Sequence, residues 1–161
     1  MRLTDYTDYT LRVLLYLAVR PSRLSTIGEI SEAYGISRNH LMKIVQQLGE
    51  LGWVETVRGR HGGLRLGERT PYLTIGEIVR TMESDFDIVG CFSRDKAHRQ
   101  CVIQSACLLR GVFATARDAF LAELDKHTVG GLARPADELS QLLGIVSVIP
   151  VSVERMQSSS A

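Results

Sequence analysis

The sequence predicts a mainly α-helical fold with one small β-hairpin, and three observations predict it. Apolar residues recur at helical spacing through much of residues 5–82 and again from 107 to 126. Capping residues precede several of these stretches. Only residues 53–66 alternate apolar and polar side chains as strands do, around the loop RGRHGG. A short helix, a tight turn, a second helix and a hairpin, in this order, are typical of a winged helix-turn-helix.

The composition sets limits on the protein class. The chain has 161 residues, 45 % of them apolar, which is enough to form one hydrophobic core. Its net charge is only +1, so the protein as a whole has no strong electrostatic field that would attract charged partners. The first apolar run spans about nine residues and contains Arg12, which is too short and too charged for a membrane span. No signal-peptide cleavage site follows it. We therefore expect a cytoplasmic protein with no membrane partner.

Residues 5–19 are expected to form the first helix. Apolar side chains recur there at the three-to-four spacing of one buried face, at Leu11, Leu14, Leu15 and Ala18. Pro21 and Ser22 follow and end the pattern.

Two helices joined by a tight turn are expected next. Thr26 and Glu29 have the spacing of a capping box, and Gly35 suits the end of a helix of about eight residues. Ser37 can then cap a third helix, which Gly52 ends. Its inward-facing residues are expected to be Leu41, Ile44, Val45, Leu48 and Leu51.

The hairpin and a fourth helix complete the first domain. Residues 53–57 and 64–66 are expected to be strands, with Gly59, Gly62 and Gly63 supplying positive φ angles at the tip. Thr74 and Glu77 repeat the capping-box spacing before a helix over about residues 75–82. We assign residues 1–82 to a winged helix-turn-helix DNA-binding domain, with the recognition helix at about 37–51 and the wing at about 53–67.

A long amphipathic pattern occupies the region after the third cysteine. Its apolar residues recur at near-heptad spacing at Leu108, Val112, Ala116, Ala119 or Phe120, and Leu124. A lone helix at the edge of a small domain cannot bury such a stripe, so residues 107–130 are expected to form a long dimerisation helix ended by Gly130, Gly131 and Pro135. The alternative is packing on its own domain. Residues 131–161 are expected to be a C-terminal segment with a flexible tail ending MQSSSA.

Positive and hydrogen-bonding side chains cluster between residues 37 and 66. Only Glu50 and Glu55 oppose them, and a near-neutral protein that binds DNA concentrates its positive charge in this way. A helix in the major groove could reach base edges with Asn39, His40 and Gln46 or Gln47, and a wing could reach phosphates or the minor groove. The alternative is a solvated helix face. The expected contacts to a double-stranded DNA operator are Ser37, Arg38, Asn39, His40, Lys43, Gln46, Arg58, Arg60, His61 and Arg65.

All three cysteines, Cys91, Cys101 and Cys107, lie within seventeen residues. They have no CxxC pair, and in a cytoplasmic chain clustered cysteines favour metal or redox chemistry over disulfides. Three interpretations stay open: an iron–sulfur cluster with a fourth ligand from elsewhere, a zinc site completed by His98, and free thiols. Ser105 is expected to cap the long helix and to place Cys107 in its first turn. Residues 83–107 are expected to be a cysteine-containing loop, which binds the cluster under the first of these interpretations.

No catalytic constellation is visible. The four histidines are scattered, no nucleophile motif occurs, and HGGLRLG lies between two strands, where phosphate-binding glycine loops do not occur. We therefore expect no enzyme. The remaining alternatives are a ferredoxin-like electron carrier, which has no use for a winged helix, and a cluster-free winged-helix regulator.

The quoted residues also carry a family resemblance. LTDYTDYTLRVLLYLA, YGISRNHLMKIVQQLGELGWVETVRGRHGGLRLG and three cysteines before a long helix resemble the NsrR branch of a family of winged-helix iron–sulfur repressors, the nitric-oxide-sensing branch. The family also includes the iron–sulfur-biogenesis regulator IscR and the rhizobial iron regulator RirA. The similarity extends over about residues 1–130.

The resemblance implies a homodimer that pairs through the long helix. It implies an iron–sulfur cluster, 4Fe–4S favoured over 2Fe–2S, held by Cys91, Cys101 and Cys107, with Asp8 of the partner subunit as the fourth ligand. Nitric oxide would be the signal: its attack on the cluster would release the dimer from DNA and derepress genes for nitric oxide detoxification.

Three features of the chain bear on how far the family pattern applies. The gap between the first two cysteines, filled by the basic segment SRDKAHRQ, is longer than usual and bears on Cys91 as a ligand. Asp5 lies near Asp8 and is the alternative carboxylate. No histidine follows Cys107 closely, which counts against the IscR branch, whereas an iron-responsive, RirA-like function stays open.

Overall fold

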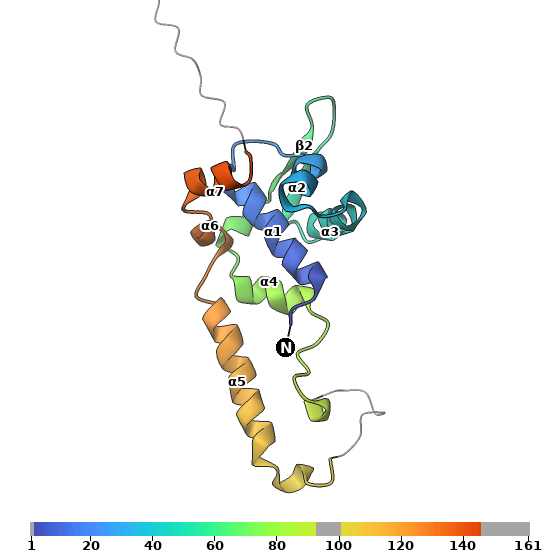
Figure 1. Ribbon diagram of the computed structural model, residues 1–161, viewed down its shortest axis with the longest axis vertical. Helices are drawn as coiled ribbons and strands as arrows, with labels where there is room; N and C mark the ends of the chain where they lie inside the picture. The colour runs from blue at the N-terminus through green and yellow to red at the C-terminus, as the bar shows by residue number, and fades with distance from the viewer. Residues whose placement is uncertain (1, 93–100, 146–161) are drawn as a thin grey trace, which may run out of the picture.

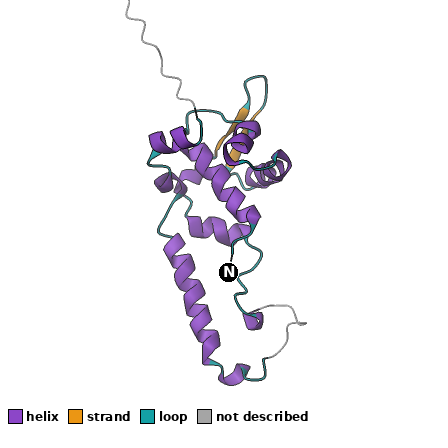
Figure 2. Ribbon diagram, viewed as in Figure 1, coloured by secondary structure: helices purple, strands orange, loops and turns teal. Residues whose placement is uncertain are grey.

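A computed structural model describes residues 2–92 and 101–145, and it confirms a mainly helical fold with one hairpin (Figures 1 and 2). The tail from residue 146 and the segment 93–100, which includes His98, lie outside the described residues. None of the described helices combines the length and the apolar character needed to cross a bilayer. The elements are α1 (Asp5–Val19), α2 (Ile27–Tyr34), α3 (Arg38–Glu50), β1 (Val54–Val57), β2 (Gly63–Leu66), η1 (Thr70–Tyr72), α4 (Ile75–Met82), η2 (Gly90–Phe92), η4 (Gln104–Ala106), α5 (Leu108–Leu124), α6 (Val129–Leu132) and α7 (Ala136–Leu142).

Local capping sets the boundaries of the helix-turn-helix, as the sequence predicted. The Thr26 hydroxyl accepts a hydrogen bond from the Glu29 amide, and the Glu29 carboxylate accepts one from the Thr26 amide at 2.6 Å. Gly35 ends α2 in the left-handed conformation, with φ of 65°. The Ser37 hydroxyl then caps α3 by accepting from the His40 amide. These caps satisfy backbone groups that the helices leave free.

Helix α1 lies at the centre of the fold and contacts α2, α3, α4, α6, α7 and β2 (Figure 1). Its buried side chains are Thr7, Thr10, Val13, Leu14, Tyr16, Leu17 and Val19. Of the predicted inward face, Leu14 is fully buried, whereas Leu11, Leu15 and Ala18 are partly buried and pack against the edge of the core. A helix contacted from several sides buries a wider arc than a single stripe, and spacing alone does not show where that arc is centred.

The C-terminal end of α3 differs from the prediction at one residue. Leu41, Ile44, Val45 and Leu48 are buried, but Leu51 is 40 % exposed and the prediction that it faces inward was wrong. Leu51 is the C-cap of α3 and Gly52 follows with φ of 69°, so the chain turns away before the Leu51 side chain reaches the core.

The wing is the antiparallel pair β1–β2, in which Val54 lies opposite Leu66 and Val57 opposite Gly63. Gly59 at its tip has φ of 117°, as predicted. The prediction was wrong for Gly62 and Gly63, because neither residue has a positive φ angle. Gly62 is needed for space instead, because a Cβ there would lie 2.2 Å from the Val57 carbonyl oxygen.

The long helix is shorter than predicted and starts later. Cys107 is its N-cap and makes no side-chain capping bond, so Ser105 does not cap it and Cys107 precedes its first turn. Ser105 lies in η4 instead. At the other end α5 stops at Leu124, and Gly130 and Gly131 belong to α6, whose N-cap is Thr128. Helix α7, within the predicted C-terminal segment, packs on α1.

The end of α5 is fastened to α4. Arg80 donates two hydrogen bonds to the Asp125 carboxylate, both 2.7 Å long, and the Ile75 amide donates to the His127 carbonyl at 2.8 Å. A Cβ at Gly76 would lie 1.9 Å from an Asp125 carboxylate oxygen, so a glycine is needed at this approach. Beyond this attachment α5 extends away from the domain, beside the chain that leads down from α4 (Figure 1).

Candidate functional site

The outer face of α3 presents the residues that the sequence predicted for DNA contact. Ser37, Arg38, Asn39, His40, Lys43 and Gln46 are all exposed, whereas Leu41, Ile44 and Leu48 hold the opposite face in the core. The helix therefore offers one polar, positively charged surface to a groove. Whether each of these side chains touches a base or a phosphate stays a prediction.

Several of these side chains have partners within the chain. The His40 ring stacks on Tyr9, with centroids 6.3 Å apart, and the Gln46 amide donates to Glu50 at 3.2 Å. In the wing, Arg65 forms an ion pair of 2.7 Å with Glu55 across the strands. These contacts restrain His40, Gln46 and Arg65 before any DNA is present.

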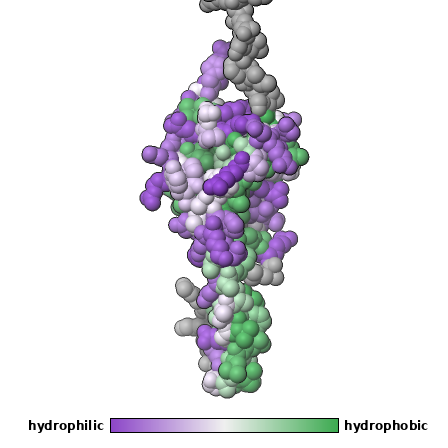
Figure 3. All heavy atoms as spheres, turned by 90° about the vertical axis from the view of Figure 1, so that its left-hand side faces the viewer, coloured by the Kyte–Doolittle hydropathy of each residue, from purple (hydrophilic) through white to green (hydrophobic). Residues whose placement is uncertain are grey.

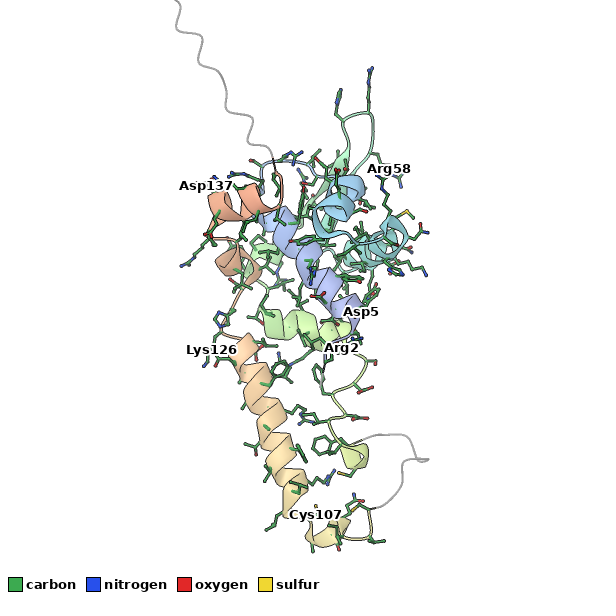
Figure 4. All side chains as sticks on the ribbon, viewed as in Figure 1. Arg2, Asp5, Arg58, Cys107, Lys126 and Asp137 are labelled. Carbon is green, nitrogen blue, oxygen red and sulfur yellow. The ribbon has the colours of Figure 1, made fainter. Side chains whose placement is uncertain are left out.

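The wing tip carries three exposed side chains that can contact DNA. Arg58, Arg60 and His61 are exposed, and no ion pair joins them to any other residue in the described ranges. Figure 4 shows nitrogen-tipped side chains that extend from the hairpin, away from the helices. Long cationic side chains at the tip of a narrow hairpin suit phosphate contact or insertion into a minor groove.

The three cysteines lie at the far end of the molecule from the wing. Cys91 lies in η2, Cys101 just before η4 and Cys107 immediately before α5. All three are free thiols; Cys101 is exposed and the other two are partly buried. A cleft of about 1060 Å³ runs between α5 and the chain after α4, and Cys107 and Phe92 both line it. The Arg117 guanidinium lies over the Phe92 ring, 5.5 Å from its centroid, and so holds η2 against α5.

The donor chemistry of this segment fits an iron–sulfur cluster, because three thiols are the ligands that such clusters prefer. In the single chain, however, these thiols do not form a ready metal site. Within residues 2–92 and 101–145, no group of three or more His, Cys, Asp or Glu side chains is placed to hold a metal ion.

Asp8 lies in the first turn of α1, and its carboxylate is engaged by Arg12. The Arg12 Nε donates to Asp8 Oδ2 at 2.9 Å, and the Asp8 side chain is 46 % exposed. The same guanidinium lies 5.6 Å from the centroid of the Tyr34 ring, which fixes its position. The alternative carboxylate, Asp5, is 69 % exposed and pairs more loosely with Arg2, at 3.4 Å.

The predicted dimerisation face of α5 is uncovered in the single chain. Leu108 is 87 % exposed and Val112 61 %, and Ala116 and Ala119 are also exposed. The side of α5 that turns toward its own domain carries Leu121, which is buried, and Phe120 and Leu124, which are partly buried. Figure 3 shows apolar residues gathered on the free lower end of the molecule. Packing on its own domain therefore leaves most of the stripe in water.

Sequence reasoning missed two residues that connect α1 to α3. Tyr6 donates a hydrogen bond of 2.5 Å to Gln47 Oε1, and Tyr9 stacks on His40. Burial, and then the nearby charge of Glu50, raise the pKa of the Tyr6 phenol, which keeps its proton available for this bond. The only signal in the sequence was that the two tyrosines are three positions apart and so share one face of the helix.

Comparison with known proteins adds a family and several relatives. The family model Rrf2, described as an iron-dependent transcriptional regulator, matches residues 3–135. The HTH-type transcriptional regulator NsrR of Bacillus subtilis is 51 % identical over 144 residues, which cover 89 % of this chain and 97 % of that protein. NsrR of Bacillus licheniformis is 45 % identical over 144 residues, which cover 89 % of this chain and 99 % of the B. licheniformis protein.

Solved structures share the fold. CymR (YrzC), the global cysteine regulator of B. subtilis, aligns with a TM-score of 0.67 at 24 % identity, over 83 % of this chain and 96 % of its own. T. potens IscR aligns with a TM-score of 0.66 at 20 % identity, over 86 % of this chain and 90 % of its own.

Proposed function

Because the chain belongs to the Rrf2 family of transcriptional regulators, we propose that it is a repressor that binds operator DNA as a homodimer and releases it in response to nitric oxide. Its regulatory class follows from the family and from relatives that are named transcriptional regulators, not enzymes. The observation that carries the nitric oxide part is the 51 % identity, over 144 residues, to a protein named NsrR. We place this activity in the cytoplasm, where operator DNA and reduced thiols occur together.

The winged helix supports the mode of DNA binding. Helix α3 would enter the major groove with its exposed residues from Arg38 to Gln46, and Arg58 and Arg60 of the wing would reach the flanking backbone or minor groove. The restraint of Arg65 by Glu55 makes it a weaker contributor than Arg60. Phosphate contacts of this kind give affinity that falls as salt rises.

The uncovered stripe of α5 supports the dimer. A second copy of the helix would bury Leu108, Val112, Ala116 and Ala119, which the single chain leaves in water. Two recognition helices related by a two-fold axis would then contact two half-sites of an operator.

The thiols of Cys91, Cys101 and Cys107 would hold an iron–sulfur cluster, 4Fe–4S favoured over 2Fe–2S, and Asp8 of the partner subunit would supply the fourth ligand. When bound, such a cluster offers one iron with a carboxylate in place of a thiolate, where a small diatomic molecule binds more readily. Other residues of the chain would hold these ligands in position. Arg12 holds Asp8 on the surface of α1, and the Arg117–Phe92 contact holds η2 beside α5.

Iron status is the second candidate signal, and the description of the matching family as iron-dependent favours it. Such a repressor would lose DNA affinity when iron is withdrawn and would not require nitric oxide.

An anaerobic titration separates the two functions. Protein reconstituted with iron and sulfide is titrated with nitric oxide, and in parallel with a ferrous chelator, while binding to operator DNA is followed by mobility shift. We expect nitric oxide to abolish the shift at amounts stoichiometric with the cluster. Loss of the shift with the chelator alone, and none with nitric oxide, would favour the iron-responsive function instead.

A further inference from the structure

The N-terminal half of α1 is joined to the edge of the recognition helix by two aromatic contacts. Tyr6 Oη donates to Gln47 Oε1 at 2.5 Å and lies 3.4 Å from the Lys43 carbonyl oxygen. The Tyr9 ring stacks on the His40 ring with an angle of 26° between their planes. On α1 the two tyrosines are three positions apart, and on α3 their partners are at 40, 43 and 47, so each set forms one face of its helix.

These contacts lie at the edge of α3, between its buried face and its exposed face. Leu41, Ile44 and Leu48 are buried in the core, whereas Arg38, Asn39 and Lys43 are exposed. Gln47, unlike its exposed neighbour Gln46, is partly buried under Tyr6. A contact at this edge fixes how far α3 can rotate about its own axis, and hence which side chains it presents outward.

We propose that Tyr6 and Tyr9 are positioning residues that set the orientation of the recognition helix through their contacts with Gln47 and His40. This inference rests on the part of the proposed function in which α3 enters the major groove of operator DNA. With the Tyr6 and Tyr9 contacts in place, one orientation of α3 is favoured, and without them the population of α3 orientations widens.

The test is a double-mutant cycle with Tyr6→Phe and Gln47→Ala, measured as affinity for operator DNA. Tyr6→Phe removes only the hydroxyl, so we expect affinity of cluster-loaded protein to fall about two- to ten-fold, the range of one hydrogen bond. Iron and sulfide content should stay at the wild-type level. In the Gln47→Ala background Tyr6→Phe should have no further effect, because the bond is already absent.

Tyr72→Phe is the matched control, since Tyr72 is 80 % exposed on η1, and its affinity should equal that of wild type. Tyr9→Leu is a second variant, which should lower affinity by removing the stack on His40. Wild-type affinity in Tyr6→Phe, or additive losses in the double mutant, would overturn the proposal. Failure of the proposed function gives a different result: wild-type protein would bind DNA equally well with and without its cluster, whereas the coupling between Tyr6 and Gln47 would still be present.

Discussion

The Glu83 carboxylate accepts hydrogen bonds from the Thr4 amide at 2.8 Å and from the Thr4 hydroxyl at 3.1 Å. Glu83 is the C-cap of α4 and Thr4 is the N-cap of α1, so the bond joins the start of the cysteine segment to the helix that carries Asp8. This connection lies within one chain and is independent of any partner.

Glu83→Ala should therefore lower the free energy of unfolding by about 1 kcal/mol, the usual net value of such hydrogen bonds. Urea unfolding of the reduced, metal-free protein measures it. Glu68→Ala, at an exposed position of the loop after the wing, is the control and should stay within about 0.5 kcal/mol of wild type. Equal stabilities of the two variants would show that the Glu83–Thr4 bond contributes nothing.

Thr10→Val should stabilise the protein. The Thr10 side chain is fully buried, and its hydroxyl oxygen has no hydrogen-bond partner in the part of the chain that the structure describes. Valine has the same shape without the polar atom, so the gain should be about 1 kcal/mol. Thr7→Val is the matched comparison, because the equally buried Thr7 hydroxyl contacts the Thr4 hydroxyl at 3.1 Å, and it should destabilise. Losses of similar size in both variants would contradict the interpretation of Thr10.

The Arg80–Asp125 pair should make the attachment of α5 sensitive to acid. Hydrogen bonds from Arg80 hold the pKa of Asp125 below its ordinary value of 3.8. A lowered pKa in the folded state stabilises the fold above pH 3.8, and that contribution is lost as the pH falls through the folded-state value.

Asp125→Asn removes this contribution at every pH. We expect wild type to unfold at a higher temperature than Asp125→Asn at neutral pH, and the difference to shrink below about pH 4. Thermal unfolding followed by circular dichroism from pH 7 to pH 3 measures both curves. A difference that stays constant over this range would show that the Asp125 carboxylate is not the group responsible.

Two wing arginines should contribute unequally to DNA binding. Arg60→Ala should weaken operator binding by about 1–3 kcal/mol if Arg60 reads a groove, or lower the salt slope by about one if it contacts phosphate only. Arg65→Ala should cost less, because Arg65 is already paired with Glu55. Glu55→Gln releases Arg65 and should strengthen binding. Fluorescence anisotropy at several salt concentrations tests all three, and unchanged affinity of Arg60→Ala at every salt would exclude the wing from the interface.

Local signals made most of the first domain predictable. Thr26, Ser37 and Thr74 cap their helices as the sequence indicated, because capping depends on residues only three positions apart. The full width of the buried face of α1 and the exposure of Leu51 were not predicted, since they depend on which distant elements pack there. Helices α6 and α7 are too short to show a clear periodicity.

The candidate site was predictable where one helix or hairpin supplies it. The exposed residues of α3 and the wing follow from a single stretch of sequence. The contact between Tyr6 and Gln47 joins positions 41 apart, which periodicity does not reveal. For the cysteines, the segment carries the right donors, but within the described residues it does not bring them together. A site shared between two subunits would explain this, because one chain then lacks part of what shapes it.

The central claim is that the metal site takes its thiols from one subunit and its carboxylate from the other, and a mixed dimer tests it most directly. One chain carries Asp8→Ala and the other carries Cys101→Ala with Cys107→Ala, and the differently tagged pair is purified and reconstituted without oxygen. If ligation crosses the dimer, one of its two sites keeps a complete ligand set. The mixed dimer should then hold about half the iron of the wild-type dimer and respond to nitric oxide as wild type does. Iron that instead shows the spectrum and nitric oxide response of the Asp8→Ala homodimer would contradict the claim.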